Sequence, residues 1–275
     1  MRFPDLQNYL ARLPRTGSGT RIWLDEAGRA QGRYFNATLT SAFQPIRRID
    51  AGTIAGFEGY VRSYSASDEG LSLWKLLDQA ANDDESVELD RLCRMLHAIN
   101  FFRQEVAGDA DLYLSVHARL LAAVESNHGI AFRRMLKVLG LPQERVVLQL
   151  PAVVERQGWL LNYVADNYRR NGFRFAVNAA DAVEALGLLD RVRPDAIKVD
   201  ARYIAQETAI SRLLEDCGKG NISVVFKRVE NPKVLATLRR VAAEVGQPLY
   251  AQGYLWDIPN AALVVRRAHR DAPDG

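Results

Sequence analysis

The chain has 275 residues, 48% of them hydrophobic and 25% charged, and 36 Lys and Arg stand against 33 Asp and Glu. This composition excludes disordered, collagen-like and disulfide-scaffold proteins, and no basic run suggests that it binds nucleic acid. The sequence contains no signal-peptide pattern and no uncharged apolar run of about 18 residues, so we expect a cytoplasmic protein without a membrane span.

The first 38 residues differ from the rest and are expected to form an N-terminal extension. A short helix is predicted by apolar residues at helical spacing, namely Phe3, Leu6, Tyr9, Leu10 and Leu13. Pro14 ends this helix, and the Gly- and Ser-containing stretch at 16–20 is interpreted as a link. A phosphate loop is disfavoured there because no strand precedes the stretch and no Gly-Lys-Ser/Thr follows it. The expected division is 1–38 and 39–270.

From about residue 40 onward, short β-rich runs alternate with longer helical patterns. The strand candidates are Ala42–Ile46, Ile54–Val61, Leu112–Val116, Val146–Leu150, Phe173–Val177, Ala196–Val199, Ile222–Phe226 and Leu249–Ala251. About eight strands, mostly followed by helices, within about 230 residues are typical of a single α/β barrel. An open doubly wound sheet is the alternative fold.

Apolar residues at helical spacing lie between these runs. The helical patterns are Leu71, Trp74, Leu77; Leu89, Leu92, Leu96, Ile99; Leu160, Tyr163, Val164, Tyr168; Ile210, Leu213, Leu214; and Val234, Leu235, Leu238, Val241, Val245. Cys93 and Cys217 fall within apolar helical segments, so we expect two buried free thiols.

In a barrel, functional residues lie at the carboxyl ends of the strands. The residues at these positions are Glu58 to Arg62, His117, Gln149, Asn178, Lys198, Asp200, Lys227, Arg228 and Gln252. Only Glu58 and Asp200 among them are acidic, whereas a divalent metal needs several converging carboxylate oxygens. The four histidines are scattered and form no evident Ser-His-Asp or Cys-His arrangement. The residues alone therefore predict neither a metal site nor a nucleophilic triad.

Several ordered motifs resemble a known family. They are Phe43-Gln44-Pro45-Ile46, Gly56-Phe57-Glu58-Gly59-Tyr60-Val61-Arg62, Leu114-Ser115-Val116-His117, Ile197-Lys198-Val199-Asp200, and Gln252-Gly253-Tyr254-Leu255 with Pro259. In order and spacing they resemble the EAL domain, a family of cyclic di-GMP phosphodiesterases, over residues 40 to 262. The resemblance implies a single (β/α)8 TIM-type barrel with a short N-terminal extension.

The resemblance also implies that most of the metal-binding chemistry is lost. Active EAL enzymes hold two Mg²⁺ or Mn²⁺ ions with carboxylates and an asparagine, and a lysine positions the attacking water. Glu58 and Lys198 are retained. The other ligand positions read His117, Gln149, Asn178-Ala179 and Lys227. Because such hydrolysis depends on those carboxylates, we expect no catalytic residues, no metal, no cofactor and no enzymatic activity.

Loss of the carboxylates changes the charge of the site. The charged residues at these positions are Glu58, Lys198 and Lys227, and their net charge is about +1. A metal-free pocket would therefore no longer repel phosphate. Tyr60 stands where the family has a leucine, and it could stack on a guanine or block the guanine pocket. The candidate ligand-binding residues are Gln44, Glu58, Tyr60, Arg62, Lys198, Asp200, Lys227, Arg228, Glu230 and Gln252.

Purely structural roles remain open for the same residues. The ion pairs to consider are Glu58 with Arg62, Glu58 with Lys198, and Asp200 with Arg202. Gln44 and Gln252 could satisfy loop backbone groups. Lys227 and Arg228 could form a solvated basic rim instead of a phosphate clamp.

Two non-enzymatic functions follow. In one, the protein is a metal-independent cyclic di-GMP receptor that signals to a regulatory protein partner. In the other, it binds no nucleotide and acts only through a protein partner. A weak metal-dependent phosphodiesterase is the third hypothesis. A homodimer is left open, but metal-switched dimerisation is not expected because Ala179-Ala180-Asp181-Ala182 replaces the family's Asp-Phe-Gly loop.

Overall fold

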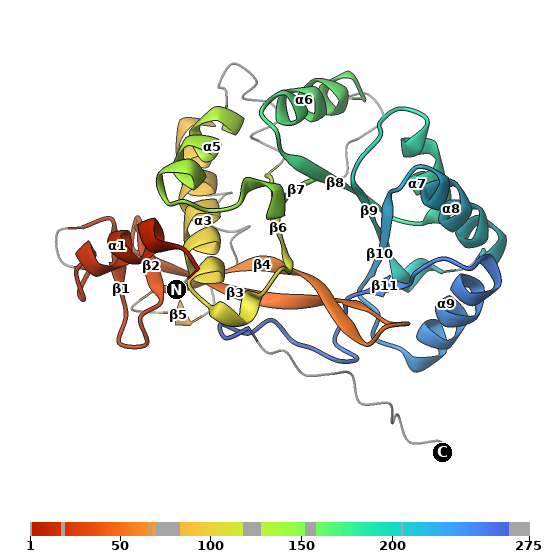
Figure 1. The fold of residues 1–275 in the computed structure, drawn as a ribbon, viewed down its shortest axis with the longest axis horizontal. Coiled ribbons are helices and arrows are strands. Elements are labelled where there is room, and N and C mark those ends of the chain that lie inside the picture. Colours follow the sequence, from red (N-terminus) through yellow and green to blue (C-terminus); the bar gives the residue numbers. More distant parts are fainter. Residues whose placement is uncertain are drawn as a thin grey trace.

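The computed structural model describes residues 2–17, 20–65, 68–69, 83–117, 128–151, 158–204 and 206–263. Within these ranges, eight strands close into a ring and helices pack around its outside (Figure 1). The predicted α/β barrel is therefore confirmed, and the open doubly wound sheet is wrong, because β3 pairs with β4 on one side and with β11 on the other.

The barrel strands overlap all the predicted runs. In order around the ring they are β3 (Ala37–Arg48), β4 (Thr53–Ser65), β6 (Asp111–Ser115), β7 (Val146–Leu150), β8 (Arg174–Ala179), β9 (Ala196–Asp200), β10 (Ser223–Lys227) and β11 (Tyr250–Ala251). Most of these strands have helices on one face and the barrel interior on the other. They are buried on both faces and read as short apolar runs.

Strand direction brings one end of β3 to the functional end of the barrel. β4 and β6 to β11 run parallel, whereas β3 is antiparallel to both of its neighbours. The carboxyl ends of the parallel strands form one rim, which we call the mouth. The amino-terminal end of β3 points toward this rim, and Gln44, farther along β3, is paired with Glu58 of β4.

Helices cover the outside of the ring. The α-helices are α1 (Pro4–Arg12), α3 (Asp83–Phe102), α5 (His128–Val138), α6 (Gly158–Arg170), α7 (Ala182–Leu189), α8 (Glu207–Lys219) and α9 (Pro232–Val245), with short 3-10 turns η1 (Glu105–Ala107), η2 (Gln143–Arg145) and η4 (Ala201–Tyr203). The patterns predicted for α1, α3, α6, α8 and α9 are confirmed, and the pattern at 71–77 lies outside the described residues. α5 and α7 were not predicted. α7 has only eight residues, and its start is fixed by the Asp181 carboxylate, which accepts hydrogen bonds from the backbone N–H of Val183 and Glu184.

The N-terminal extension contributes strands that the sequence analysis did not predict. β1 (Ile22–Leu24) and β2 (Ala30–Tyr34) form a hairpin that pairs with the start of β3. Figure 1 shows α1, β1 and β2 together beside the barrel. The expected boundary at residue 38 falls inside β3, and the β2–β3 pairing joins the extension to the barrel sheet. The division into two units stays a prediction.

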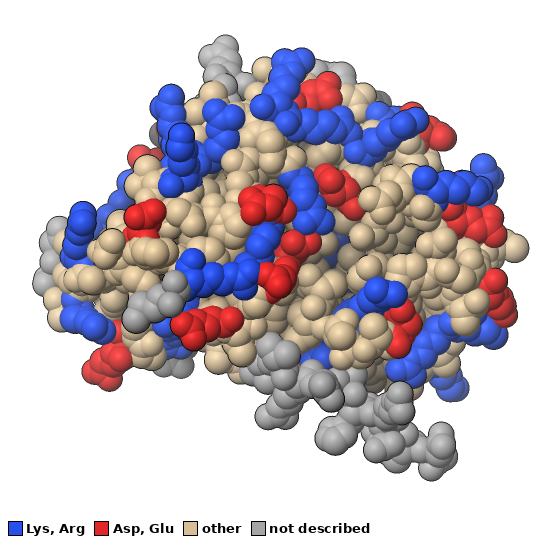
Figure 2. All heavy atoms as spheres, viewed as in Figure 1, with Lys and Arg blue, Asp and Glu red and all other residues tan. Residues whose placement is uncertain are grey.

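Apolar packing fills both the barrel and the space under the helices. Inside the ring, one layer consists of Ile46, Tyr113, Val147, Ala176, Ala196 and Val225. A larger cluster lies between the sheet and the helices, and it includes Cys93 and Cys217, which are buried and free as predicted. Lys, Arg, Asp and Glu are interspersed over the face drawn in Figure 2. Among the described residues, no helix has the length and apolar character required to cross a membrane.

A glycine at the mouth allows two loops to touch. An added Cβ at Gly253 would lie 2.1 Å from the backbone oxygen of Val229. We expect Gly253→Ala to lower the free energy of unfolding by about 2 kcal/mol or more, because backbone on both sides would have to move.

Denaturant unfolding at equilibrium measures this change. Gly187→Ala in α7 is the control, since its Cβ would meet no atom within 4 Å, and it should be neutral or slightly stabilising. Equal stability of the two variants would contradict the expected clash.

Candidate functional site

A polar layer lies at the mouth, directly above the apolar layer inside the barrel. Side chains two residues apart along a strand point to the same face. The second residue after each apolar position therefore also points inward: Tyr113 leads to Ser115, Val147 to Gln149, Ala176 to Asn178, Ala196 to Lys198, and Val225 to Lys227. On the antiparallel β3, Gln44 stands two residues before Ile46. The switch from apolar to polar residues along the strands thus creates the candidate site.

Glu58 and Lys198 form an ion pair in this layer. The Lys198 Nζ donates a hydrogen bond to Glu58 Oε2 at 2.6 Å. The Lys198 side chain is 0% exposed and that of Glu58 12% exposed. The Lys198 Nζ also donates to Gln252 Oε1 at 3.0 Å and lies 5.6 Å from the centre of the Tyr113 ring. The structure therefore contains the Glu58–Lys198 ion pair that was considered from the sequence.

Further hydrogen bonds hold Glu58 in its ionised form. The Gln149 Nε2 donates to Glu58 Oε1 at 3.0 Å, and the Gln252 Nε2 donates to Oε2 at 2.8 Å. Burial alone would raise the pKa of this carboxyl, but the charge of Lys198 and the three hydrogen bonds outweigh burial and lower the pKa to about 2. Glu58 is therefore a carboxylate at every pH at which proteins normally work.

The Gln252 side chain connects Glu58 to β3. Its Nε2 lies 2.9 Å from Gln44 Oε1 and 3.0 Å from the Tyr60 hydroxyl. Burial and the negative charge of Glu58 raise the pKa of Tyr60, so its hydroxyl keeps the proton. Gln44 in turn donates through Nε2 to the backbone oxygen of Asp257 at 2.7 Å, which is the loop-satisfying role considered for it above.

Lys227 carries a positive charge at the edge of the polar layer. Its Nζ donates to Asn178 Oδ1 at 2.8 Å, and Asn178 Nδ2 donates to the Leu150 carbonyl at 2.9 Å. In the described part of the chain, no carboxylate lies within ion-pairing distance of Lys227. Burial lowers the pKa of Lys227, and the charges of Lys198 and Arg228 lower it further. Lys227 is thus a partly buried cation that hydrogen bonds to a neutral amide.

Asp200 organises the rim beyond Lys227. Its carboxylate accepts hydrogen bonds from Arg202 at 2.9 Å and from Arg228 at 2.7 Å. The Asp200–Arg202 ion pair considered from the sequence is therefore present. Burial would raise the pKa of Asp200, but its hydrogen bonds to both arginines lower it. Arg228 has a φ of 60°, an unusual conformation for a residue with a side chain. Glu230 is exposed and lies outside the Glu58 network.

Arg62 does not pair with Glu58. It lies farther along β4, is exposed, and donates through NH2 to the backbone oxygen of Pro259 at 3.2 Å. The considered Glu58–Arg62 ion pair is therefore absent from the structure, because both Glu58 oxygens are directed to Lys198, Gln149 and Gln252.

The polar layer does not fit a divalent cation. Both oxygens of Glu58 already accept hydrogen bonds, and the Lys227 ammonium would repel a metal ion. His117 interacts instead with the buried Asp90 of α3, partly through a backbone hydrogen bond. Among the residues that the structure describes, no three His, Cys, Asp or Glu side chains cluster as metal ligands would.

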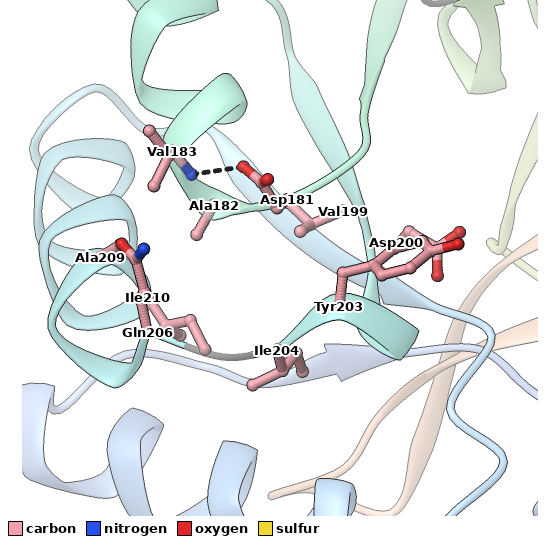
Figure 3. A pocket seen from close by; sticks show the side chains of 10 residues that line it. All are labelled: Asp181, Ala182, Val183, Val199, Asp200, Tyr203, Ile204, Gln206, Ala209 and Ile210. Atoms are coloured by element: carbon pink, nitrogen blue, oxygen red, sulfur yellow. Dashed lines mark hydrogen bonds between the residues drawn. The ribbon is translucent and has the colours of Figure 1, made fainter.

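A small pocket lies beside the rim, between the start of α7 and η4. Figure 3 shows Asp181, Val183, Asp200 and Tyr203 around it, and its volume is about 80 Å³. Sites for small-molecule ligands usually measure about 300 Å³ or more. This pocket therefore matches the size of a single side chain, and it does not include the Glu58 network.

The structure brings together half of the predicted ligand-binding residues in one hydrogen-bonded network. These residues are Gln44, Glu58, Tyr60, Lys198 and Gln252. Lys227 borders the network, Asp200 and Arg228 pair with each other on the rim, and Arg62 and Glu230 are exposed. The sequence analysis missed Arg47 and Asp257, which form a hydrogen-bonded ion pair behind Gln44. This pair was missed because Asp257 lies after the last predicted strand, in a segment for which the sequence pattern gave no position on the barrel.

The chain matches the model of one protein family. The model of the EAL domain matches residues 18–256. No curated protein matches the chain by sequence.

Solved structures share the fold at low sequence identity. Klebsiella pneumoniae BlrP1, in a calcium and cy-diGMP complex, has a TM-score of 0.69 at 20% identity, with 83% of this chain and 59% of that chain covered. The FimX EAL domain from Pseudomonas aeruginosa, bound to c-di-GMP, has a TM-score of 0.66 at 16% identity, with 84% and 94% covered. The Bacillus subtilis YkuI protein, in complex with substrate c-di-GMP and calcium, has a TM-score of 0.65 at 20% identity, with 84% and 58% covered. The chain thus spans about three fifths of the BlrP1 and YkuI chains.

The lowered pKa of Glu58 predicts a specific pH dependence of stability. The pKa of Glu58 falls from 4.5 in the unfolded chain to about 2 in the folded protein. This difference stabilises the folded protein above pH 4.5, and the stabilisation is lost as the pH falls toward 2. Between about pH 5 and about pH 3 the loss should be about 2 kcal/mol. Glu58→Gln lacks this contribution, so the difference in unfolding free energy between wild type and Glu58→Gln should shrink by that amount. Denaturant titrations at each pH measure it, and parallel pH profiles would contradict it.

The buried ion pair predicts a non-additive response to mutation. Lys198→Met leaves the Glu58 charge buried without its partner and should lower the free energy of unfolding by about 3–5 kcal/mol. Adding Glu58→Gln removes the stranded charge, so the double variant should regain part of that loss. Lys219→Met, at a lysine 75% exposed on α8, is the control and should change little. Equal destabilisation in the single and double Lys198 variants would show that the pair is not coupled.

Proposed function

We propose that this chain, which belongs to the EAL domain family, is a non-hydrolytic regulatory member that binds cyclic di-GMP without metal and acts on a protein partner. The observation that carries the proposal is the hydrogen-bonded Lys198–Glu58 pair at the centre of the mouth. The pair is buried, and Gln149 and Gln252 complete the hydrogen bonding of its carboxylate.

The absence of hydrolysis is inferred from the donors at the mouth. Two-metal hydrolysis needs carboxylates to bind the ions and to lower the pKa of the attacking water. Glu58 has its oxygens occupied by protein donors, and amides or an ammonium stand around it at Gln149, Asn178 and Lys227. These groups favour a site that works without metal.

Binding of a phosphate-containing ligand is supported by the charge of the mouth. Lys198 and Glu58 neutralise each other, so Lys227 leaves the layer with an excess positive charge. Arg62 adds an exposed guanidinium, whose planar fork suits a phosphate. The BlrP1, FimX and YkuI structures contain a cyclic di-GMP ligand, which makes this the anionic ligand to test first.

Action on a protein partner is supported by exposed apolar side chains that follow the strand ends at the mouth. Val183, Tyr203, Tyr254 and Ile258 follow β8, β9 and β11, and each is at least half exposed. Together with arginines, exposed aromatic and aliphatic side chains are typical of protein interfaces.

A protein-only function is the second candidate. It is favoured by the self-contained network, since Gln44, Tyr60 and Gln252 satisfy one another where a ligand would have to enter. A ligand would have to replace some of these hydrogen bonds, at a cost in affinity.

Calorimetric titration with cyclic di-GMP, once with Mg²⁺ and once with EDTA, tests the proposal. We expect a Kd of about 1 μM or tighter, equivalent to about −8 kcal/mol, that is the same in both buffers. Binding abolished by EDTA, or nucleotide cleavage that requires Mg²⁺ or Mn²⁺, would contradict it and favour a phosphodiesterase. No heat from a folded sample, with an unchanged melting temperature, would favour the protein-only function.

Lys227→Glu tests the charge argument within the same assay. Reversing this partly buried charge beside a phosphate should weaken binding at least about tenfold. Lys219→Glu makes the same charge change on exposed α8 and should leave the affinity unchanged. Equal affinities of Lys227→Glu and wild type would rule out Lys227 as a counter-charge for the ligand.

A further inference from the structure

The two carboxylates whose charge acts on Lys227 are both paired with other cations. Glu58 pairs with Lys198 at 2.6 Å. Asp200 pairs with Arg228 at 2.7 Å. In the described parts of the chain, no carboxylate is left to form an ion pair with the Lys227 amine, which donates instead to a neutral amide oxygen.

The surroundings of Lys227 disfavour its charged form. Burial lowers the pKa of Lys227, and the positive charges of Lys198 and Arg228 lower it further. The negative charges of the two paired carboxylates raise this pKa, but they do not compensate for the other causes. A larger share of the Lys227 amine is therefore neutral near pH 7 than is usual for a lysine. The neutral amine is the form that acts as a nucleophile.

The other described lysines lie in different environments. Lys198 is 0% exposed and ion-paired, so its amine stays charged and out of contact with solvent. Lys219 is 75% exposed and ion-paired, and Lys137 and Lys233 are exposed on α5 and α9. Among the lysines that the structure describes, only Lys227 is neither fully buried nor exposed. It combines access from the mouth with a partly desolvated amine.

We propose that Lys227 is an acylation site: an acyl phosphate transfers its acyl group to the Lys227 amine, and the resulting loss of charge weakens ligand binding at the mouth. In this reaction, Nζ attacks the carbonyl carbon, and a carbon–nitrogen bond replaces the carbon–oxygen bond to phosphate. Phosphate departs with the electron pair of that bond, and the proton lost by the nitrogen passes to solvent. The excess positive charge of the mouth attracts this anionic reagent.

Acylation changes the charge of the mouth at the residue that determines it. Lys198 and Glu58 neutralise each other, so Lys227 supplies the excess positive charge of the polar layer. An acylated lysine is an uncharged amide. The effect on ligand binding rests on the proposed function, whereas the acylation of Lys227 does not depend on it.

Treatment of the full chain with acetyl phosphate, followed by mass spectrometry of its peptides, tests the site. We expect the initial rate of acetylation at Lys227 to be about fivefold higher than at Lys219, because more of the Lys227 amine is neutral. The rate at Lys227 should also level off at a lower pH than the rate at Lys219. A rate at Lys227 no higher than at Lys219, or the same pH profile for both, would overturn the acylation site.

Asn178→Asp tests the electrostatic cause at the same amine. The substitution places a carboxylate where the amide oxygen accepts from Lys227 Nζ at 2.8 Å. It should hold the ammonium form and lower acetylation of Lys227 about tenfold. Asn162→Asp, on exposed α6, is the matched control and should leave the rate unchanged. Equal rates in Asn178→Asp and wild type would contradict the proposal.

A folding check accompanies this variant. Asn178→Asp also loses the hydrogen bond that Nδ2 donates to the Leu150 carbonyl, so its melting temperature is measured first. If the variant does not fold, the pH profile of the wild type decides.

A neutral acyl donor, p-nitrophenyl acetate, tests the class of reagent. The mouth does not attract a neutral molecule, so the ratio of the Lys227 rate to the Lys219 rate should be about threefold lower than with acetyl phosphate. Equal ratios for the two reagents would overturn the preference for acyl phosphates.

Calorimetry with cyclic di-GMP tests the effect on binding. Acetylation of the wild type should weaken binding at least about tenfold, because the charge of Lys227 is lost. The same treatment should not change whatever affinity Lys227→Arg has, since that variant has no amine at this position. Equal affinities of treated and untreated wild type would overturn the regulation. No binding by untreated wild type would overturn the proposed ligand, and the acetylation rates would still decide the site.

Discussion

The buried ion pair between Lys198 and Glu58 is the interaction on which the mouth of this barrel depends. A lysine that is 0% exposed is stable in its charged form only beside a counter-charge, and Glu58 is that counter-charge. In the ring order of the strands, β4 and β9 stand opposite each other, so the pair spans the barrel interior. The pair thereby fixes the Glu58 carboxylate, which accepts hydrogen bonds from Gln149 and Gln252 and so orients their side chains. Lys198 and Gln252 donate to Glu58 Oε2 and Gln149 donates to Oε1, so both carboxylate oxygens already accept hydrogen bonds from the protein, which links the stability of the mouth to its chemistry.

From this pair, hydrogen bonds extend outward to the surface. Gln252 joins Glu58 to Gln44, and Gln44 joins the network to Asp257 in the segment that follows β11. The ligand that we propose for the mouth would therefore meet side chains that also contact the segment beyond β11. In such an arrangement, a regulatory protein needs no chemistry at its site, because displacement of a few hydrogen bonds is enough to change the exposed surface.

The sequence predicted the barrel and the position of its polar end more completely than the contacts at that end. The barrel strands were identifiable because strands such as β7 and β9 are buried on both faces and read as apolar runs. Gln149 and Lys198 were placed at the mouth because they stand at the carboxyl ends of predicted strands, and the Lys198–Glu58 pair was among the alternatives considered. The contact of Arg62 with Pro259 was not predictable, because Pro259 lies after the last predicted strand, in a segment whose path over the barrel the sequence pattern does not define. β1 and β2 were missed because they are short and are stabilised by pairing with β3.

The central claim is that protein side chains occupy the place and the role of metal ions at this mouth. A titration of the wild-type protein with Mn²⁺, followed by the electron paramagnetic resonance signal of the free ion, tests it most directly, with and without cyclic di-GMP. The account predicts that the free Mn²⁺ signal equals that of buffer at ion concentrations up to about 1 mM, where a carboxylate-rich site would be filled. One or two ions bound per chain at micromolar concentrations, and lost in Glu58→Gln, would contradict it.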